Sequence, residues 1–273
     1  MNRVLLCPPD FFSIRYEINP WMSLSRDVNP ETATAQWRQL LETLRSLDCE
    51  VEVLSPEPDW PDMVFTANAG LVAGSRFLLG NFRHPKRQGE TPAYERWFAD
   101  HGFEIVPLPK IHVFEGEGDA LWFGETLFCG HGFRTDREIA GWLAEELRCA
   151  VVDFALNDPH FYHLDTCFCP LHGGEALWHP PAFSEASQRM MRDHVLDLVT
   201  VPPEEALRFA CNAVVLGRHV LIPAGCPETS RMLVERGYEC HPLPMSEFIK
   251  SGGACKCLVL RLSADPWQHH GSG

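Results

Sequence analysis

Residues 71–108 read LVAGSRFLLGNFRHPKRQGETPAYERWFADHGFEIVPL, and this stretch contains a structural unit that recurs along the chain. Its two apolar runs, joined by a turn at Gly74, predict a β-hairpin. The stretch from Ala93 towards Gly102 predicts a helix that ends at the glycine. Residues 104–108 then supply another short strand. The unit is therefore strand, turn, strand, helix, strand.

The same order recurs in about five units of roughly 45 to 55 residues, which is typical of a repeat architecture. Further hairpins are predicted at 120–130, 166–178 and 212–223, short strands at 51–54, 151–154 and 197–201, and the last unit closes with 256–262. Because each helix needs a sheet to cover, five units favour a five-bladed α/β propeller with its helices outside. A doubly wound parallel sheet is the alternative. We expect residues 1–265 to form a single catalytic domain and residues 266–273 a disordered tail.

Two helix starts carry capping signals. Asn29, Pro30 and Glu31 provide an N-cap, a proline in the first turn and an acidic first turn. Thr135 and Glu138 have the spacing of a capping box and precede an apolar helical pattern. Weaker helical stretches are predicted at 184–195 and 228–237.

Composition excludes several classes of protein. The chain has 273 residues, 45% of them hydrophobic, and a formal net charge of -14, which favours a folded protein without a nucleic-acid partner. No apolar run approaches the ~18 residues of a membrane span, and the N-terminus lacks a secretory pattern. The 11 cysteines are scattered, so we expect reduced thiols and a cytoplasmic protein. An assembly of identical chains is compatible with the sequence, which does not determine the oligomeric state.

Two cysteines in Ser251-Gly-Gly-Ala-Cys-Lys-Cys257 are candidate nucleophiles. The glycine pair permits positive φ and close backbone approach, and Lys256 could favour the thiolate of a neighbouring cysteine. The alternative is that Cys255 and Cys257 are core residues. A non-enzymatic interpretation is a metal or redox module made by four cysteines, Cys167, Cys169, Cys255 and Cys257.

Two further segments carry acid and base groups. His163 and Asp165 lie two residues apart in FYHLDT, at the predicted start of a strand, so they would share one face and suit acid–base chemistry. A histidine with only a structural role is the alternative. Glu115, Glu117 and Asp119 in FEGEGD suit a cationic ligand or the orientation of a histidine, whereas a solvated turn would need neither.

Arginines and amides complete the candidate residues. Arg83, Arg87 and Arg134 could clamp a carboxylate, although single exposed arginines are usually surface charges. Asn19 and Asn68 place amides in apolar segments, where burial would demand hydrogen-bond partners. Each asparagine could instead belong to a turn.

Taken in order, VFTAN, RQGE, FEGEGD, GFRT, FYHLDT and SGGACKC resemble the motifs of the guanidine-modifying superfamily over nearly the whole chain. This superfamily includes arginine deiminases, dimethylarginine dimethylaminohydrolases, arginine dihydrolases and amidinotransferases. The resemblance implies a five-bladed α/β propeller, a small guanidino substrate, and a Cys, His and acidic triad that forms a covalent thiouronium intermediate without a metal or other cofactor.

The resemblance also implies roles for individual residues. The family's Gly-Gly-x-x-x-Cys pattern selects Cys257 as the nucleophile, and His163 matches the catalytic histidine. Glu115 is preferred as the acid that orients His163, with Glu117 as the fallback. The substrate-binding residues implied by the resemblance are Asp165 and Asp119 for the guanidinium nitrogens, Arg87 and Arg134 for the α-carboxylate, and Asn19 in a segment that lines the site.

Asn68 decides the expected substrate. Deiminases have Phe-Thr-Arg-Asp where this chain has Phe65-Thr-Ala-Asn68. A neutral amide can donate as well as accept, so it could rebind a ureido group, and the motif is similar to that of arginine dihydrolases. We therefore expect arginine to yield ornithine, carbon dioxide and ammonia. The alternatives are a dimethylaminohydrolase or deiminase that stops at citrulline, and an amidinotransferase.

Overall fold

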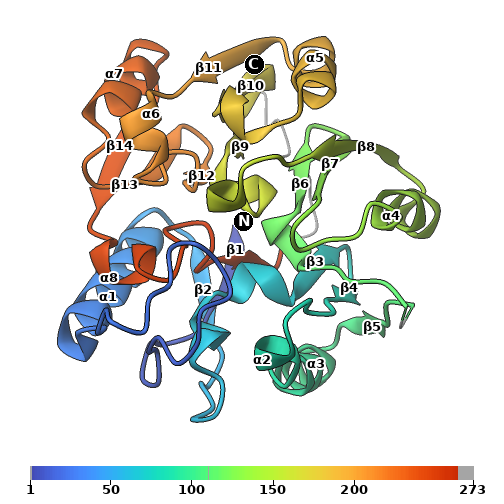
Figure 1. Cartoon of the computed structure of the whole chain (residues 1–273), viewed down its shortest axis with the longest axis vertical. Helices are drawn as coiled ribbons and strands as arrows, with labels where there is room; N and C mark the ends of the chain where they lie inside the picture. Colours follow the sequence, from blue (N-terminus) through green and yellow to red (C-terminus); the bar gives the residue numbers. More distant parts are fainter. Residues whose placement is uncertain (1, 110, 264–273) are drawn as a thin grey trace.

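Five small sheets surround a common axis in the computed structural model of the chain, which describes residues 2–109 and 111–263 (Figure 1). Each sheet has three strands, and the longer helices lie on the outside. This arrangement confirms the five-bladed α/β propeller. The doubly wound alternative is wrong, since none of the sheets in the described residues exceeds three strands. The predicted tail at 266–273 lies outside the described residues.

Four blades repeat the predicted unit. In each, the middle strand pairs antiparallel with its hairpin partner and parallel with the strand that follows the helix. The strands of these blades are β3 (Gly70–Ala73), β4 (Arg76–Leu79) and β5 (Glu104–Val106); β6 (Ala120–Phe123), β7 (Thr126–His131) and β8 (Ala150–Ala155); β9 (Phe168–Pro170), β10 (Glu175–Trp178) and β11 (Asp197–Thr200); and β12 (Val214–Leu216), β13 (His219–Pro223) and β14 (Glu239–Leu243).

The first blade contains both ends of the described chain. Its strands are β15 (Leu260–Arg261), β1 (Arg3–Leu6) and β2 (Glu50–Val53), in that order across the sheet. The expectation that residues 256–262 close the last unit is therefore wrong. The blade of β12, β13 and β14 is already complete, whereas β1 would have an unpaired edge without β15. Pairing of the first and last strands closes the propeller.

The helices confirm most of the sequence predictions. In α1 (Pro30–Ser46), Asn29 accepts a hydrogen bond of 2.8 Å from the Thr32 amide, and Trp37, Leu40 and Leu44 are buried. The other helices are α2 (Pro85–Gln88), α3 (Thr91–Asp100), α4 (Ile139–Leu147), α5 (Glu185–His194), α6 (Pro203–Ala206), α7 (Pro227–Glu235) and α8 (Ser246–Ile249). In the described part of the chain, no helix has both the length and the apolarity needed to cross a membrane.

The predicted capping box before α4 is wrong. Glu138 is the N-cap residue in helical conformation, with no side-chain cap. The Thr135 hydroxyl instead donates to Asp119 at 2.7 Å and accepts from the Glu115 amide at 3.1 Å. Without Thr135, the buried Oδ2 atom of Asp119 would lose its hydrogen-bond donor, so this tertiary contact outweighs the local helix cap.

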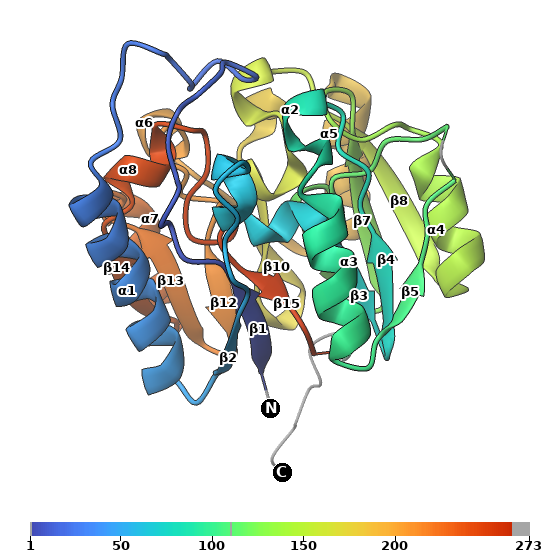
Figure 2. The ribbon, with the colours of Figure 1, turned by 90° about the horizontal axis from the view of Figure 1, so that it is seen from below.

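The two ends of the propeller differ. Figure 2 shows β1 beginning at one end of the molecule, while the loop that follows β1 crosses the opposite end together with α2. Connections between strands therefore gather over the axis at that second end, where residues distant in sequence can meet.

Candidate active site

Cys257 lies in a turn three residues before β15, where buried polar groups surround its thiol. The Asn212 amide donates to Cys257 Sγ at 3.1 Å, and its oxygen accepts from the amides of Ala254 and Cys257. The thiol donates to Asp165 Oδ2 at 3.3 Å. Asn212 thus fixes the loop and the sulfur together. The family pattern implies a position for this cysteine at the start of the last strand, whereas the loop here turns before β15 begins.

The glycine pair before Cys257 permits close packing, as predicted. Gly252 has φ +83°, and a Cβ there would lie 2.8 Å from the Tyr162 hydroxyl. A Cβ on Gly253 would lie 3.0 Å from Cys257 Cβ. Tyr162 donates to the Gly252 carbonyl at 2.8 Å, so a side chain at either glycine would disturb the loop that carries the thiol.

The surroundings of Cys257 favour the protonated thiol. Burial raises its pKa well above the ordinary value, and the Asp165 carboxylate raises the pKa further. The Lys256 ammonium donates instead to Glu117 at 2.9 Å and to the Val259 carbonyl. The expectation that Lys256 favours the thiolate is therefore wrong, because burial and Asp165 dominate the pKa of Cys257.

His163 precedes a 3-10 turn at Leu164–Thr166, so the expectation of a strand face shared with Asp165 is wrong. His163 Nε2 lies 2.8 Å from Glu115 Oε2. Burial tends to raise the pKa of Glu115, but Arg134 and His163 hold it well below the ordinary value. Burial lowers the pKa of His163 to about 4 despite Glu115. Since a carboxylate only accepts, Nε2 carries the proton and Nδ1 is left as the basic nitrogen.

The remaining acids have distinct surroundings. Burial raises the pKa of Asp165 to about 7, and its Oδ1 has no hydrogen-bond partner. Asp119 accepts from the Leu164 amide at 3.0 Å and from Thr135 at 2.7 Å. Through these two contacts Asp119 positions the segment that follows His163, and its expected contact with the guanidinium stays a prediction. Glu117 pairs with Lys256, which leaves Glu115 at the histidine.

Both candidate arginines are buried and engaged. Arg87 makes a two-bond contact with Glu90 at 2.8 Å each and donates to Asn68 Oδ1 at 2.8 Å. Arg134 donates to Glu115 at 3.0 Å and to the Ile18 carbonyl. In contrast, Arg83 is exposed and pairs with a surface aspartate, Asp136. Arg87 and Arg134 therefore give a cavity wall a fixed positive charge.

The two candidate amides also lie at this cavity. Asn19 donates to the Ser251 carbonyl at 3.0 Å and accepts from the Trp21 amide, which ties the N-terminal loop to the glycine loop. The Asn68 oxygen faces Arg87, so its Nδ2 group is the donor left over. That nitrogen is buried and has no partner. An unpartnered buried donor marks a place for a ligand acceptor.

A cavity of about 270 Å³ joins these groups; its polar lining includes Asn19, Asp62, Asn68, Arg87, Arg134, Tyr162 and Cys257. Glu115 and Asp165 contact this lining from behind, through Arg134 and Cys257. A larger hollow of about 690 Å³ at the other end of the axis is mostly apolar and is not lined by Cys257, so we assign the chemistry to the smaller one.

Sequence reasoning missed three residues of this site: Asn212, Asp62 and Tyr162. Asn212 begins the fourth hairpin run, and Asp62 stands two residues before the VFTAN motif that includes Asn68. At both positions a polar residue stands beside apolar neighbours, a pattern that indicates a buried side chain with a hydrogen-bond partner. Asp62 accepts from Tyr16 at 2.7 Å, and its Oδ1 is unpartnered.

A thiol, a neutral imidazole and several carboxylates on the axis of a five-bladed α/β propeller are suited to covalent attack on a cationic carbon. The fold and the site thus define a class, the propeller proteins with a cysteine, a histidine and carboxylates at the axis. Comparison with known proteins gives the family. Residues 15–263 match the profile of the family described as N,N dimethylarginine dimethylhydrolase, eukaryotic. The chain belongs to this family.

Individual relatives agree with that assignment. The chain is 41% identical over 273 residues to the bifunctional arginine dihydrolase/ornithine cyclodeaminase ArgZ of Synechocystis sp., covering 96% of this chain and 38% of the relative. It is 38% identical over 261 residues to N(G),N(G)-dimethylarginine dimethylaminohydrolase of Mycobacterium tuberculosis, covering 96% and 86%. The N-terminal domain of ArgZ, a serine mutant bound to substrate, superposes with a TM-score of 0.94 at 40% identity, covering 96% of this chain and 98% of that domain. The chain thus spans little more than a third of the bifunctional relatives.

The cysteine metal or redox module is not supported. Within residues 2–109 and 111–263, no group of three close metal-ligating side chains includes Cys167, Cys169, Cys255 or Cys257. Burial raises the pKa of each of these thiols. Buried protonated thiols are poor ligands and poor redox sensors.

Proposed function

We propose that the chain is an arginine dihydrolase, which converts arginine to ornithine, carbon dioxide and two ammonia. One observation carries the proposal: the site holds an unpartnered acceptor, Asp165 Oδ1, and an unpartnered donor, Asn68 Nδ2. The acceptor suits the N–H groups of a guanidinium, and the donor suits the oxygen of the ureido group formed after one hydrolysis. The dihydrolase name of the matched ArgZ domain is consistent with this proposal.

The first hydrolysis begins when the guanidinium enters beside Asp165 and Cys257. The added positive charge favours the thiolate, so the thiol proton passes to His163 Nδ1. The sulfur attacks the guanidinium carbon, and the same proton then moves to the leaving nitrogen, which departs as ammonia. Water attacks the resulting thiouronium carbon while His163 takes its proton. Collapse breaks the C–S bond and leaves citrulline in the cavity.

The second hydrolysis requires the ureido group of citrulline to remain bound in the cavity. Asn68 Nδ2 donates to the ureido oxygen and keeps its carbon next to Cys257. Attack by sulfur expels a second ammonia, protonated by His163, and gives a thiocarbamate. Water then releases the carbamate of ornithine, which loses carbon dioxide. A site whose two groups were both anionic would repel the ureido oxygen and stop at citrulline.

The charges on the cavity wall suit the amino-acid end of the substrate. Arg87 uses four of its N–H groups on Glu90, Asn68 and the Asp62 carbonyl, which leaves one of five for an α-carboxylate. Arg134 supplies further positive charge. Asp62 Oδ1 is the acceptor that suits an α-ammonium group. These contacts favour a free amino acid over a bare guanidine such as agmatine.

Product analysis tests the proposal directly. Purified protein would be incubated separately with arginine, citrulline, asymmetric dimethylarginine and agmatine, and the products identified by mass spectrometry. Ornithine from arginine supports the dihydrolase. Citrulline alone from arginine would make this a deiminase, and citrulline from dimethylarginine alone a dimethylaminohydrolase. A new guanidino compound formed when glycine is added to arginine would indicate an amidinotransferase.

Glu115→Gln should slow turnover by about 10²- to 10³-fold, because His163 loses the carboxylate that orients it. Glu115 also raises the pKa of His163, so the acidic limb of the kcat/KM profile should move to lower pH. Arg134 would lose its charged partner, at a cost of about 3 kcal/mol in the free energy of unfolding. Rate–pH profiles and urea denaturation measure both effects. Lost stability with an unchanged rate profile would limit Glu115 to a structural role.

Asp165→Asn should make the Cys257 thiol more reactive and arginine turnover slower. The Asp165 charge raises the pKa of Cys257, so its removal lowers that pKa and leaves more thiolate at pH 7.5. We expect alkylation of Cys257 by iodoacetamide to become about tenfold faster, while arginine turnover falls. Peptide mapping gives the rate at Cys257, with buried Cys255 as the internal control. Slower alkylation in the variant would contradict the proposed electrostatics.

We further propose that the protein works in a reducing compartment and that residues 1–265 form a single catalytic unit. All 11 cysteines are free, and most are buried, which supports a reducing compartment such as the cytoplasm. Pairing of β15 with β1 supports residues 1–265 as a single catalytic unit, since removal of either strand would open the first blade.

A further inference from the structure

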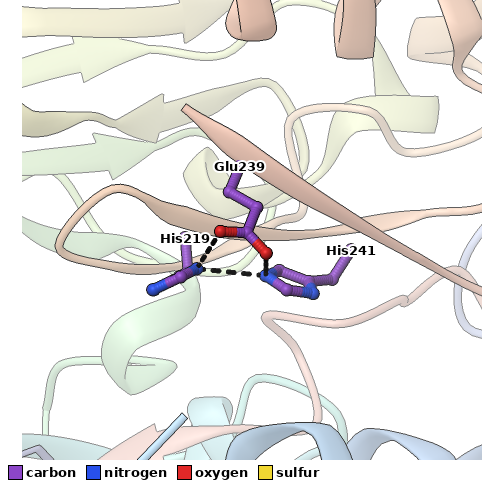
Figure 3. Close-up of side chains that lie close together, drawn as sticks. All are labelled: His219, Glu239 and His241. Carbon is purple, nitrogen blue, oxygen red and sulfur yellow. Dashed lines mark hydrogen bonds and ion pairs between the residues drawn. The ribbon is translucent and has the colours of Figure 1, made fainter. Parts of the chain in front are cut away.

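Three potential metal ligands lie together on the blade formed by β12, β13 and β14 (Figure 3). His219 is the first residue of β13, and the parallel register places Glu239 of β14 directly opposite it. His241 follows Glu239 by two residues and therefore points to the same face of the sheet. The backbone pairing of two strands thus holds all three side chains on one surface.

The distances between neighbouring groups are close to those around a tetrahedral ion, with each histidine facing a different oxygen of Glu239. With metal–ligand bonds of about 2.0–2.1 Å, tetrahedral geometry separates neighbouring ligand atoms by about 3.3 Å. His219 Nδ1 lies 3.2 Å from His241 Nε2 and 3.5 Å from Glu239 Oε2. His241 Nε2 lies 3.8 Å from Glu239 Oε1. With one oxygen taken from Glu239, all three ligand atoms lie within 4.8 Å of one another, so a rotation of its exposed carboxylate toward the two imidazoles would surround one ion.

The three groups are available for a ligand. The ion pairs of Glu239 in the described chain are with His219 and His241, and none is with an arginine or a lysine. Side-chain exposures of 38% for His219, 22% for His241 and 67% for Glu239 leave an entry path from solvent. The formal net charge of -14 also favours association with a cation.

We propose that His219, Glu239 and His241 bind one divalent transition-metal ion of the zinc type, with water as the fourth ligand. Two imidazoles and one carboxylate favour zinc, nickel or cobalt over magnesium and calcium, which prefer oxygen ligands. Cys240 lies between the two ligands of β14 on the opposite face, where its thiol contacts the Ser230 carbonyl, so the site contains no thiolate.

The site is separate from the hydrolytic chemistry. β12 follows Asn212, which contacts Cys257, and runs away from it to the turn before His219. The ligands therefore lie at the far end of the blade from the nucleophile. An ion there would tie β13 to β14 across the connection formed by α7. The expected consequence is a more stable blade with unchanged hydrolysis of arginine.

Titration calorimetry of the full chain with Zn²⁺ at pH 7.5 tests the site. We expect one equivalent to bind tightly, with about tenfold or greater loss of affinity in His219→Ala, Glu239→Gln and His241→Ala. His194→Ala is the matched control, because His194 is exposed on α5 and has no carboxylate partner among the described residues. Histidines 269 and 270 of the sequence are common to all variants, so their contribution cancels.

Co²⁺ provides an independent measurement of the ligand type. The wild-type complex should show ligand-field bands without a sulfur charge-transfer band, and the bands should be lost in the double variant His219→Ala/His241→Ala. Saturating Zn²⁺ should raise the Tm of the wild type and leave that of the double variant unchanged. Circular dichroism and arginine turnover verify that the variants fold. Equal Zn²⁺ affinity in wild type and double variant, absence of wild-type binding, or a thiolate spectrum would each overturn the proposal.

Discussion

Cys257→Ser is expected to reduce turnover of arginine by about 10³-fold or more, while Cys255→Ser keeps activity within a few fold of wild type. Cys257 lines the cavity and contacts Asp165 and Asn212, so serine there removes the nucleophile and leaves the surrounding shape intact. Cys255 is fully buried in a hydrophobic cluster with Phe209 and Leu258 and is absent from the cavity lining. Initial rates of ammonia release at saturating arginine give both values.

The two cysteine variants also distinguish chemistry from folding. Both sites are buried, and serine adds a polar hydroxyl at each, so thermal unfolding should show similar, modest losses. Acid quench followed by intact-mass measurement should trap a covalent adduct in wild type and in Cys255→Ser, and none in Cys257→Ser. An adduct on the Cys257→Ser protein, or inactivity of Cys255→Ser alone, would move the nucleophile to another residue.

Asn68→Asp should change the product from ornithine to citrulline. A carboxylate at this position can pair with Arg87 but offers no donor to the ureido oxygen, so the second hydrolysis loses its contact. The first hydrolysis should persist, because the guanidinium gains a second anionic partner. We expect the ratio of ornithine to citrulline to fall by about 10²-fold or more, corresponding to the loss of one hydrogen bond to a buried polar group in the transition state.

Direct assay of citrulline as a substrate isolates the second step. Asn68→Asp should consume arginine at a rate within about tenfold of wild type and leave added citrulline intact. Asn19→Asp is the matched control, because Asn19 lines the same cavity but has its amide and its oxygen engaged with Ser251 and Trp21. Unchanged conversion of citrulline by Asn68→Asp would remove Asn68 from the second hydrolysis.

Much of the fold follows from local sequence patterns. The hairpin around Gly74 and the helix that begins after Asn29 depend on residues close together in the chain, and both were predictable for that reason. The repeat of such units favours the propeller. Closure of the propeller was not predictable in the same way. β15 pairs with β1 because β1 needs an edge partner, and the local sequence of residues 256–262 does not indicate which strand that partner is.

The candidate site also combines features predictable from local motifs with features that depend on tertiary contacts. The motifs around Cys257 and His163 identify candidate chemistry from residue type alone, and they favour Glu115 over Glu117 only through resemblance. Tertiary contacts separate the two acids: Glu115 lies against His163, and Glu117 pairs with Lys256. Asn212 was missed because its role depends on contacts with residues 45 positions away.

Local sequence patterns specify the repeating unit, the helix start capped by Asn29 and the residue types available for covalent chemistry, since each depends on spacing along one short segment. Contacts between distant segments specify how the first blade closes, why Thr135 bonds to Asp119 and Glu115 rather than capping a helix, and which buried polar atoms keep no protein partner. Burial makes every unpaired polar group costly, and the partner that satisfies such a group is selected by proximity in space.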